Sequence, residues 1–306
     1  MKNAEKLVCT ACTNKFFLSI IKGQIQHDHG RINIVNVGII GYGSMGKMLA
    51  DKFAAAQISE LEKIYVTNRS KEKLSTVPVG VTVCAENQEL AERADIVFVC
   101  VRPVDLPDTI AKIASFLKPD ALLVSLNGNI TFEMIGRITA QKTAKVIPSL
   151  TAEINRSQSL VCFNDDVTDE DKECLKKLLN CIGNVIELPE KEMGMGSELV
   201  SCMPGFIASI FDVICKAAKK HTEIPDEQIV KMVLSTLSAT GDLMLQKEMT
   251  FEEVVTRVAT KGGITQEGTA VVYEKLPEVA DELFEKTMAK RRMVAENAAE
   301  SFLQRR

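Results

Sequence analysis

Blocks of apolar and polar positions alternate along the first two-thirds of the chain, and most blocks have the length of a strand or a helix. A β-branched apolar run that begins near Ile34 predicts a buried strand. The segment KMLADKFAAA at 47–56 predicts a helix, and KIYVTN at 63–68 predicts the next strand. Further strands are predicted at 94–101, 121–128, 144–150, 159–164 and 184–188, with helical segments between most of them. This alternation indicates an α/β fold with a doubly wound, mostly parallel sheet.

The pattern changes after Pro189, where strand signals fade. The segment at 196–221 is apolar nearly all round, with an interruption at Pro204-Gly205, and predicts a helix buried inside a domain or at a subunit interface. Further helices are predicted at 225–246, 250–260 and 278–304, and KGGITQEGT at 261–269 breaks the pattern. We therefore expect an extension at 1–33, an α/β domain at 34–189 and an all-α domain at 190–306.

The composition is that of a globular protein with a sizeable core. Of the 306 residues, 46% are hydrophobic and 25% are charged, and the formal net charge is −4. This weak charge gives no electrostatic reason to expect nucleic acid or an anionic membrane as a partner, and no apolar run reaches the length of a membrane span. The nine cysteines are odd in number and scattered, which is typical of reduced thiols in a cytoplasmic protein.

The extension contains four residues of types that bind metals, namely Cys9, Cys12, His27 and His29. Zinc sites usually space the two histidines more widely, and no second CxxC accompanies the first. We predict no metal site, and either a helix packed on the rest of the chain or a loose tail is compatible with this segment.

A glycine-rich turn, GYGSMG, connects the first predicted strand to the helix after it. In this spacing Gly41 permits a tight turn, Gly43 lets a pyrophosphate approach the backbone, and Gly46 lets the helix pack closely on the strand. The start of the helix adds free N–H groups and the positive end of the helix dipole. We expect a dinucleotide to contact Gly41, Tyr42, Gly43, Ser44, Met45 and Gly46.

The second predicted strand ends in TNRS rather than in an acidic residue. An acid at this place accepts hydrogen bonds from a ribose 2′-hydroxyl and would repel a 2′-phosphate. Asn68 and Ser70 can hydrogen-bond a phosphate, and Arg69 can pair with one through its planar guanidinium. Ser70 can also serve as the N-cap of a following helix. We therefore predict NADP(H) as the cofactor in preference to NAD(H).

Ligands of such sheets bind beyond the carboxyl ends of the strands, where this chain has polar or turn residues. The candidates for the nicotinamide side of the cofactor are Val101, Arg102, Pro103, Asn127, Gly128, Pro148 and Ser149.

In their order along the chain, these motifs resemble the pyrroline-5-carboxylate reductase family over about residues 34–298. GIIGYGSMG resembles the family's opening, TNRS its Asn-Arg-Ser, and CVRPVDL its Val-Lys-Pro segment. VSLNGNIT, VIPSLTA and TKGGIT stand where the family has Ser-x-x-Ala-Gly, Met-Pro-Asn-x-Pro and Ser-Pro-Gly-Gly-x-Thr. The resemblance implies a Rossmann domain followed by a helical domain that forms a homodimer through long interlocking helices. It also implies hydride transfer from NAD(P)H to a cyclic imine, which yields proline.

The resemblance assigns substrate roles to residues of the helical domain. Thr265 stands where the family has the Thr that contacts the substrate ring nitrogen, and Gly262 and Gly263 stand where backbone N–H groups hold the substrate carboxylate. Glu248 lies near the place of a candidate proton donor. Two more residues belong to segments that match the substrate pocket, Thr260 and Pro204.

The chain departs from the family pattern around this expected pocket. Ser149 replaces the family's Asn, Lys261 replaces its Pro, and Met203 replaces a small residue. These departures resemble the divergent branch of late competence proteins. Reduction of another small imine or carbonyl acid, and a non-catalytic regulatory protein that binds NADP, are therefore alternatives to the synthesis of proline.

Overall fold

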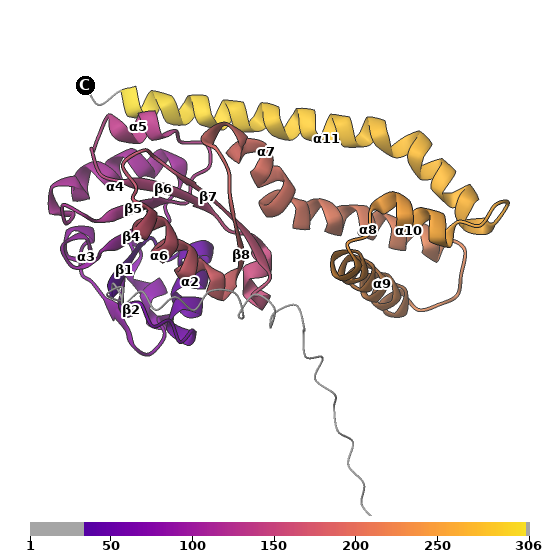
Figure 1. Ribbon diagram of the computed structural model, residues 1–306, viewed down its shortest axis with the longest axis horizontal. Helices are drawn as coiled ribbons and strands as arrows, with labels where there is room; N and C mark the ends of the chain where they lie inside the picture. The colour runs from indigo at the N-terminus through magenta and orange to yellow at the C-terminus, as the bar shows by residue number, and fades with distance from the viewer. Residues whose placement is uncertain (1–33, 304–306) are drawn as a thin grey trace, which may run out of the picture. The chain divides into compact units, whose positions relative to one another are not determined.

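The computed structural model describes residues 34–303 and contains an eight-stranded sheet (Figure 1). The strands are β1 (Val35–Ile40), β2 (Leu61–Thr67), β3 (Val81–Val83), β4 (Ile96–Val99), β5 (Leu122–Ser125), β6 (Thr143–Ile147), β7 (Ser157–Phe163) and β8 (Gly183–Glu187). Their order is β3-β2-β1-β4-β5-β6-β7-β8, and every neighbouring pair is parallel except β6 and β7. The predicted mostly parallel sheet is confirmed. The four potential metal ligands of the extension lie outside the described residues.

Helices cover both faces of this sheet. They are α2 (Ser44–Ala55), α3 (Asn87–Arg93), α4 (Leu106–Ile113), α5 (Phe132–Gly136) and α6 (Asp169–Leu179) (Figure 1). Ile96 and Phe98 of β4 pack in the apolar cluster that contains residues of α2 and α6, whereas Val97 and Val99 pack in the cluster that contains residues of α3 and α4. Successive side chains of a strand point to opposite faces, so the two clusters lie on opposite sides of the sheet. This double burial explains why all four residues of β4 are apolar and buried.

The strand order changes direction at β1. The chain passes from β1 outward through β2 to β3 and then returns to the other side of β1 as β4. In sheets of this kind ligands bind beyond the carboxyl ends of the strands at such a switch point. The glycine turn follows β1, and Val101 lies in the loop after β4, so both belong to the switch point.

From residue 190 onward the described chain is helical. The longer elements are α7 (Met193–Ser197), a π-helical turn (Glu198–Cys202), α8 (Met203–Lys219), α9 (Asp226–Lys247), α10 (Phe251–Val258) and α11 (Ile264–Leu303). The C-terminal end of α11 packs on the sheet, because Ala298 and Phe302 are buried in the cluster that also contains residues of α3 and α4. The predicted all-helical region is confirmed.

The helices of this region continue past two prolines, one of which, Pro204, was expected to interrupt a helix. Pro204 lies near the start of α8, and a π-helical turn joins α8 to α7, so the helical chain continues through this proline. Pro277 lies inside α11, which begins at Ile264 instead of near residue 278. A proline removes one backbone hydrogen bond, and in α11 the turns on both sides continue the helix.

Much of the apolar surface of the last four helices is uncovered in the single chain. No residue of α8 is buried, so the alternative that this helix lies inside a domain is wrong. The stretch Glu190–Lys219 has the length of a membrane span, contrary to the expectation from the sequence. Its most apolar 18-residue window has a mean hydropathy of 1.6, and 6% of that window is buried. Length and composition are weak evidence for a membrane helix, because an apolar face that another subunit covers gives the same signal. Exposed large apolar residues of these helices include Ile210, Val213, Ile214, Leu234, Leu245, Phe251, Val271, Val272 and Val279.

We expect Phe98→Ala to lower the free energy of unfolding by about 3–5 kcal/mol, because it leaves a cavity in a closely packed core. The Phe98 side chain is 0% exposed, and its ring centroid lies 5.6 Å from that of Phe53. Chemical denaturation followed by circular dichroism measures the change. Phe116→Ala is the control, since Phe116 is 39% exposed, and an equal loss in both variants would contradict the prediction.

Candidate functional site

The backbone on both sides fixes the glycine turn after β1. Gly41 has a φ of +97°, a left-handed conformation that favours glycine. Its N–H donates to the carbonyl oxygen of Thr67 at 2.9 Å, and a Cβ on Gly41 would lie 2.7 Å from the carbonyl oxygen of Cys100. A side chain at this position would therefore push the turn away from the loop after β4.

Gly43 and Gly46 are glycines for two different reasons. A Cβ on Gly46 would lie 1.9 Å from the carbonyl oxygen of Gly41, so α2 can pack against the turn only without a side chain there. A Cβ on Gly43 would meet no atom within 4 Å. Packing does not require glycine at this position, and the open space beside the backbone fits a pyrophosphate that approaches closely.

The N-terminal end of α2 is suited to an anion. Gly43 is the N-cap, no side chain in the described part of the protein caps the helix, and its first turn contains no acidic residue. The first N–H groups of a helix have no partner within the helix, and they carry the positive end of its dipole. Ser44 and Met45 therefore provide backbone donors beside the open space at Gly43.

Asn68 connects the glycine turn to the loop after β2, a role that the sequence did not indicate. Its Oδ1 accepts a hydrogen bond from the N–H of Tyr42 at 2.9 Å, and its Nδ2 donates to the carbonyl oxygen of Ser70 at 2.9 Å. The Nδ2 group has a second hydrogen, which remains for a phosphate. Tyr42 is 2% exposed and donates its hydroxyl to the carbonyl oxygen of Thr76, and burial raises the pKa of that hydroxyl.

Arg69 is exposed in the loop after β2. Ser70 precedes the short 3-10 helix Lys71–Thr76 as its N-cap residue, but its side chain makes no capping hydrogen bond. The ammonium of Lys71 donates to the carbonyl oxygen of Ala85. Among these three residues, Arg69 has the planar group that can bind a phosphate through two N–H donors.

Asn127 joins the loops that follow β4 and β5. Its Nδ2 donates to the carbonyl oxygen of Val101 at 3.1 Å, and its own N–H donates to Ser125 Oγ at 3.2 Å. A Cβ on the next residue, Gly128, would lie 2.6 Å from Cδ1 of Ile147, so a side chain there would require the end of the Ile147 side chain to move. Val101, Asn127 and Gly128 therefore lie together at the switch point.

The other candidates for the nicotinamide side differ in exposure. The side chain of Arg102 is 69% exposed and forms an ion pair with Asp105 at 2.8 Å. Pro103 begins the short 3-10 helix Pro103–Asp105. Ser149 is 2% exposed, and its N–H donates to Ser157 Oγ at 3.0 Å. Of these residues, Ser149 is held firmly by the fold.

An ion pair between a buried lysine and a half-buried glutamate, which the sequence did not indicate, supports the loop after β5. The Nζ of Lys145 lies 2.8 Å from Oε1 of Glu190 and donates to the carbonyl oxygen of Ile130 at 3.1 Å. Oε1 of Glu190 also accepts the N–H of Phe132 at 2.8 Å. The lysine within a mostly apolar predicted strand was the available sequence signal for this ion pair. Its side chain is 1% exposed, and a charge that is buried to this degree requires a partner.

The residues assigned to the substrate lie at the turn between α10 and α11 and at nearby helix ends. Gly262 has a φ of +72° and donates its N–H to Oε1 of Gln266 at 2.6 Å. Gly263 donates its N–H to the carbonyl oxygen of Thr260 at 2.8 Å. Thr265 is exposed in the first turn of α11. The two N–H groups expected to hold a carboxylate are thus engaged within the turn.

Glu248 and Pro204 also lie at helix ends. Glu248 is exposed, has a φ of +54° and ends α9. Pro204 lies in the first turn of α8.

Within one chain, α11 separates the turn that contains Thr265 from the cofactor residues. Near its other end, Nη1 of Arg291 is 3.8 Å from the position that a Cβ on Gly128 would take. At 1.5 Å per residue, about 39 Å of helix lies between Thr265 and Arg291, and α11 runs that distance without reversing (Figure 1). The structure therefore does not bring Thr265 to the Gly128 end of the same chain.

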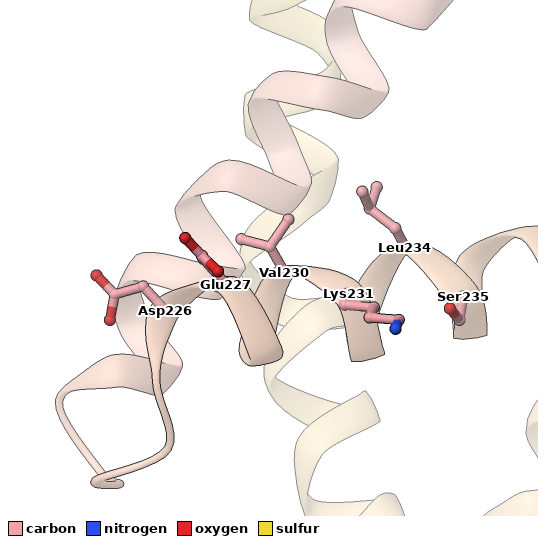
Figure 2. A pocket seen from close by; sticks show the side chains of 6 residues that line it. All are labelled: Asp226, Glu227, Val230, Lys231, Leu234 and Ser235. Carbon is pink, nitrogen blue, oxygen red and sulfur yellow. The ribbon is translucent and has the colours of Figure 1, made fainter.

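A hollow on α9 lies apart from all of these residues in the sequence. Figure 2 shows its six lining side chains, which all come from the first turns of α9 and are all exposed. They are Asp226, Glu227, Val230, Lys231, Leu234 and Ser235. The hollow contains none of the residues predicted to bind cofactor or substrate, so it belongs to the uncovered surface of the helical region.

Comparison with known proteins identifies the family. The family model described as NADP oxidoreductase coenzyme F420-dependent matches residues 36–129, and the model described as pyrroline-5-carboxylate reductase dimerisation matches residues 190–294. Pyrroline-5-carboxylate reductase 3 of Bacillus subtilis (strain 168) is 31% identical over 85% of this chain and 97% of its own length. The chain belongs to the pyrroline-5-carboxylate reductase family.

Further relatives of this reductase family member agree with the assignment. ComE operon protein 4 of the same Bacillus strain is 24% identical over 84% of this chain and 95% of its own length. The crystal structure of Plasmodium falciparum pyrroline carboxylate reductase with NADP bound has a TM-score of 0.73 at 20% identity, over 88% of this chain and 99% of that one. The enzyme from Streptococcus pyogenes has the same TM-score at 18% identity and the same coverage. These structures share the fold of this chain.

The family and the geometry together support NADP(H) binding by an oxidoreductase with a Rossmann fold. The matched dimerisation domain supports a homo-oligomer, in agreement with the uncovered apolar helices.

The variants Gly43→Ala and Gly46→Ala separate cofactor binding from packing. We expect Gly43→Ala to keep the melting temperature within about 2 °C of the original chain, since its methyl group meets open space. The same methyl group fills the phosphate position and should weaken NADPH binding about tenfold or more. Gly46→Ala should lower the melting temperature as well, because its methyl group meets the carbonyl oxygen of Gly41. Thermal unfolding and NADPH fluorescence titration test both, and tight NADPH binding by Gly43→Ala would contradict the assignment.

Proposed function

We propose that this chain is a cytoplasmic, NADPH-dependent reductase that converts 1-pyrroline-5-carboxylate to L-proline. The observation that carries the proposal is its 31% identity to pyrroline-5-carboxylate reductase 3 of Bacillus subtilis over 97% of that protein. Family membership supports an oxidoreductase, and the C=N bond of a cyclic imine as its target is the step that we add.

In this proposal the cofactor lies across the switch point of the sheet. Arg69 pairs with the 2′-phosphate, with Asn68 and Ser70 as flanking donors. The pyrophosphate lies beside Gly43 at the start of α2, where backbone N–H groups and the helix dipole favour an anion. The nicotinamide ring lies against the residues that follow β4 and β5, namely Val101, Asn127 and Gly128, with Arg102 and Pro103 at its edge.

The chemistry requires positioning more than a strong base. When bound, NADPH supplies a hydride to the imine carbon, and the C=N π electrons move to the ring nitrogen, which already carries the proton of the iminium form. The hydroxyl of Thr265 accepts a hydrogen bond from that nitrogen and fixes the orientation of the ring. Glu248 is the candidate donor of the further proton that the product amine takes up.

The substrate carboxylate has donors at the start of α11. The first N–H groups of this helix, at Ile264 and Thr265, precede the intrahelical bonds and carry the positive end of the dipole. The N–H of Gly262 can join them once the side chain of Gln266, which lies 2.6 Å away, turns aside. Thr260 and Pro204 complete the proposed lining of the pocket.

A complete site in this proposal contains residues of two copies of the chain. Thr265 and the Gly128 end of the cofactor site lie about 39 Å apart along α11 at the rise of an α-helix, which is too far for a hydride transfer within one chain. The apolar faces of α8 to α11 are exposed and require a covering partner. A homodimer through these helices covers the apolar faces and brings the start of α11 of one copy to the nicotinamide of the other.

A spectrophotometric assay of NADPH oxidation with 1-pyrroline-5-carboxylate tests this function, and a variant tests the role of Thr265. We expect turnover by the original chain and a fall in kcat of about 10- to 100-fold for Thr265→Val, because one hydrogen bond to a charged group is lost. Thr269→Val is the matched control on the same helix, since the hydroxyl of Thr269 bonds to the carbonyl oxygen of Gln266. A purified chain that binds NADPH but does not reduce this substrate would refute the synthesis of proline.

Cofactor discrimination depends on Arg69 in this proposal. We expect Arg69→Ala to raise the KM for NADPH about tenfold and the KM for NADH less than about twofold, because only NADPH carries the 2′-phosphate. Lys73→Ala, which removes an exposed cation of the neighbouring 3-10 helix, is the control. Equal changes in both KM values would mean that Arg69 does not recognise the 2′-phosphate.

A further inference from the structure

A three-residue network connects the helical region to the loop after β5. Arg291 of α11 donates from Nη2 to Oε1 of Glu198 at 2.7 Å and from Nε to the same oxygen at 3.1 Å. Its Nη1 donates to Oδ1 of Asn129 at 2.8 Å. One guanidinium therefore holds a carboxylate of the π-helical turn and an amide of the cofactor loop at the same time.

This network is shielded from water. The side chain of Glu198 is 2% exposed and that of Arg291 is 17% exposed. An ion pair of this burial is sensitive to the loss of either partner, because the remaining charge would lie unpaired in a medium of low polarity. Glu198 stands in a π-helical turn, a local distortion that is frequent at functional sites. Within residues 34–303, its Oε2 has no hydrogen-bond partner, so the pair is built around Oε1 alone.

The contacts of the network continue into the cofactor site. Asn129 follows Gly128, whose backbone packs against Ile147 so closely that a Cβ would lie 2.6 Å from its Cδ1. Asn127 bonds to the carbonyl oxygen of Val101 at 3.1 Å. A Cβ on Gly41 would in turn lie 3.3 Å from Cγ1 of Val101. Hydrogen bonds, chain neighbours and close packing thus connect Arg291 through the loops after β5 and β4 to the glycine turn.

We propose that Arg291 and Glu198 are positioning residues for the nicotinamide half of bound NADP(H). Arg291 holds Asn129, and Asn129 fixes the backbone of Asn127 and Gly128, against which the ring lies. Glu198 neutralises Arg291 and fixes the direction of its planar group. The proposal rests on the placement of the nicotinamide beside Asn127 and Gly128 given above, and it does not depend on which substrate is reduced.

The geometry favours arginine at position 291 over any other cation. The guanidinium has donors on three nitrogens in one plane, and here they reach two partners from different elements. A lysine at this position has one ammonium and cannot reproduce both contacts with the same directions. Arg291→Lys therefore keeps the positive charge at this position and removes the planar group that bonds to Glu198 and Asn129 at the same time.

The test compares two ligands that differ by the nicotinamide ring. NADPH contains the ring. The other ligand, 2′-phospho-ADP-ribose, has the same adenosine 2′-phosphate, pyrophosphate and second ribose but no nicotinamide ring. Their dissociation constants are measured by fluorescence titration and by competition, for the full chain and for Asn129→Ala, Glu198→Gln and Arg291→Lys. We expect each variant to bind NADPH about tenfold more weakly and 2′-phospho-ADP-ribose within about twofold of the original affinity.

Arg292→Lys is the matched control, since Arg292 is the exposed neighbour on the same helix. Equally weakened binding of both ligands by the three variants would overturn the proposal, because the network would then support only the fold. Unchanged NADPH binding by these variants would overturn it as well. Melting temperatures identify a variant that does not fold. In that case the binding of the two ligands by Asn129→Ala tests the proposal, because this variant leaves the ion pair of Arg291 and Glu198 intact. A failure of the chain to reduce 1-pyrroline-5-carboxylate would leave these binding results unchanged, so the two proposals fail separately.

Discussion

The close approach of α2 to the glycine turn is the constraint on which the cofactor half of the protein depends. The carbonyl oxygen of Gly41 occupies the space that a side chain on Gly46 would need, so the helix starts directly against the end of β1. This contact sets the first turn of α2 beside the switch point, where β1 separates β2 from β4. Asn68 then holds the turn to β2, and Asn127 holds the loops after β4 and β5 to each other. The donors that we propose for the pyrophosphate are backbone groups, so for that part of the cofactor the position of the chain matters more than the identity of its side chains.

The two halves of the chain differ in how far they bury their apolar residues. The sheet buries its strands under helices on both faces, and β4 and β5 have no exposed residue. The helices from α8 to α11 leave large apolar side chains in contact with solvent, which is a surface that another subunit normally covers. The end of α11 is the exception, because Ala298 and Phe302 are buried against the sheet domain. One helix therefore belongs to both halves and fixes where the uncovered helical surface begins.

The features that could be predicted from the sequence are those with a local signature. β1, β4 and β5 are mostly apolar runs, and the glycine spacing identified the turn and its cofactor class. β3 has only three residues at the edge of the sheet, too few for a recognisable pattern. The predicted start of the last helix near residue 278 was wrong, because α11 begins at Ile264 and continues through Pro277. The links of Asn68 to Tyr42 and of Arg291 to Glu198 join residues 26 and 93 positions apart, and no local pattern carries such a distance.

The cysteine at the glycine turn has an electrostatic consequence for the cofactor. Cys100 follows β4, and its carbonyl oxygen is the atom that a side chain on Gly41 would meet. Its thiol packs against the core, and burial raises the pKa of the thiol well above its usual value. A raised pKa keeps the sulfur protonated and neutral across the physiological range, and a neutral thiol is a poor nucleophile. A neutral thiol at Cys100 would therefore add no negative charge beside the pyrophosphate that we propose at the glycine turn.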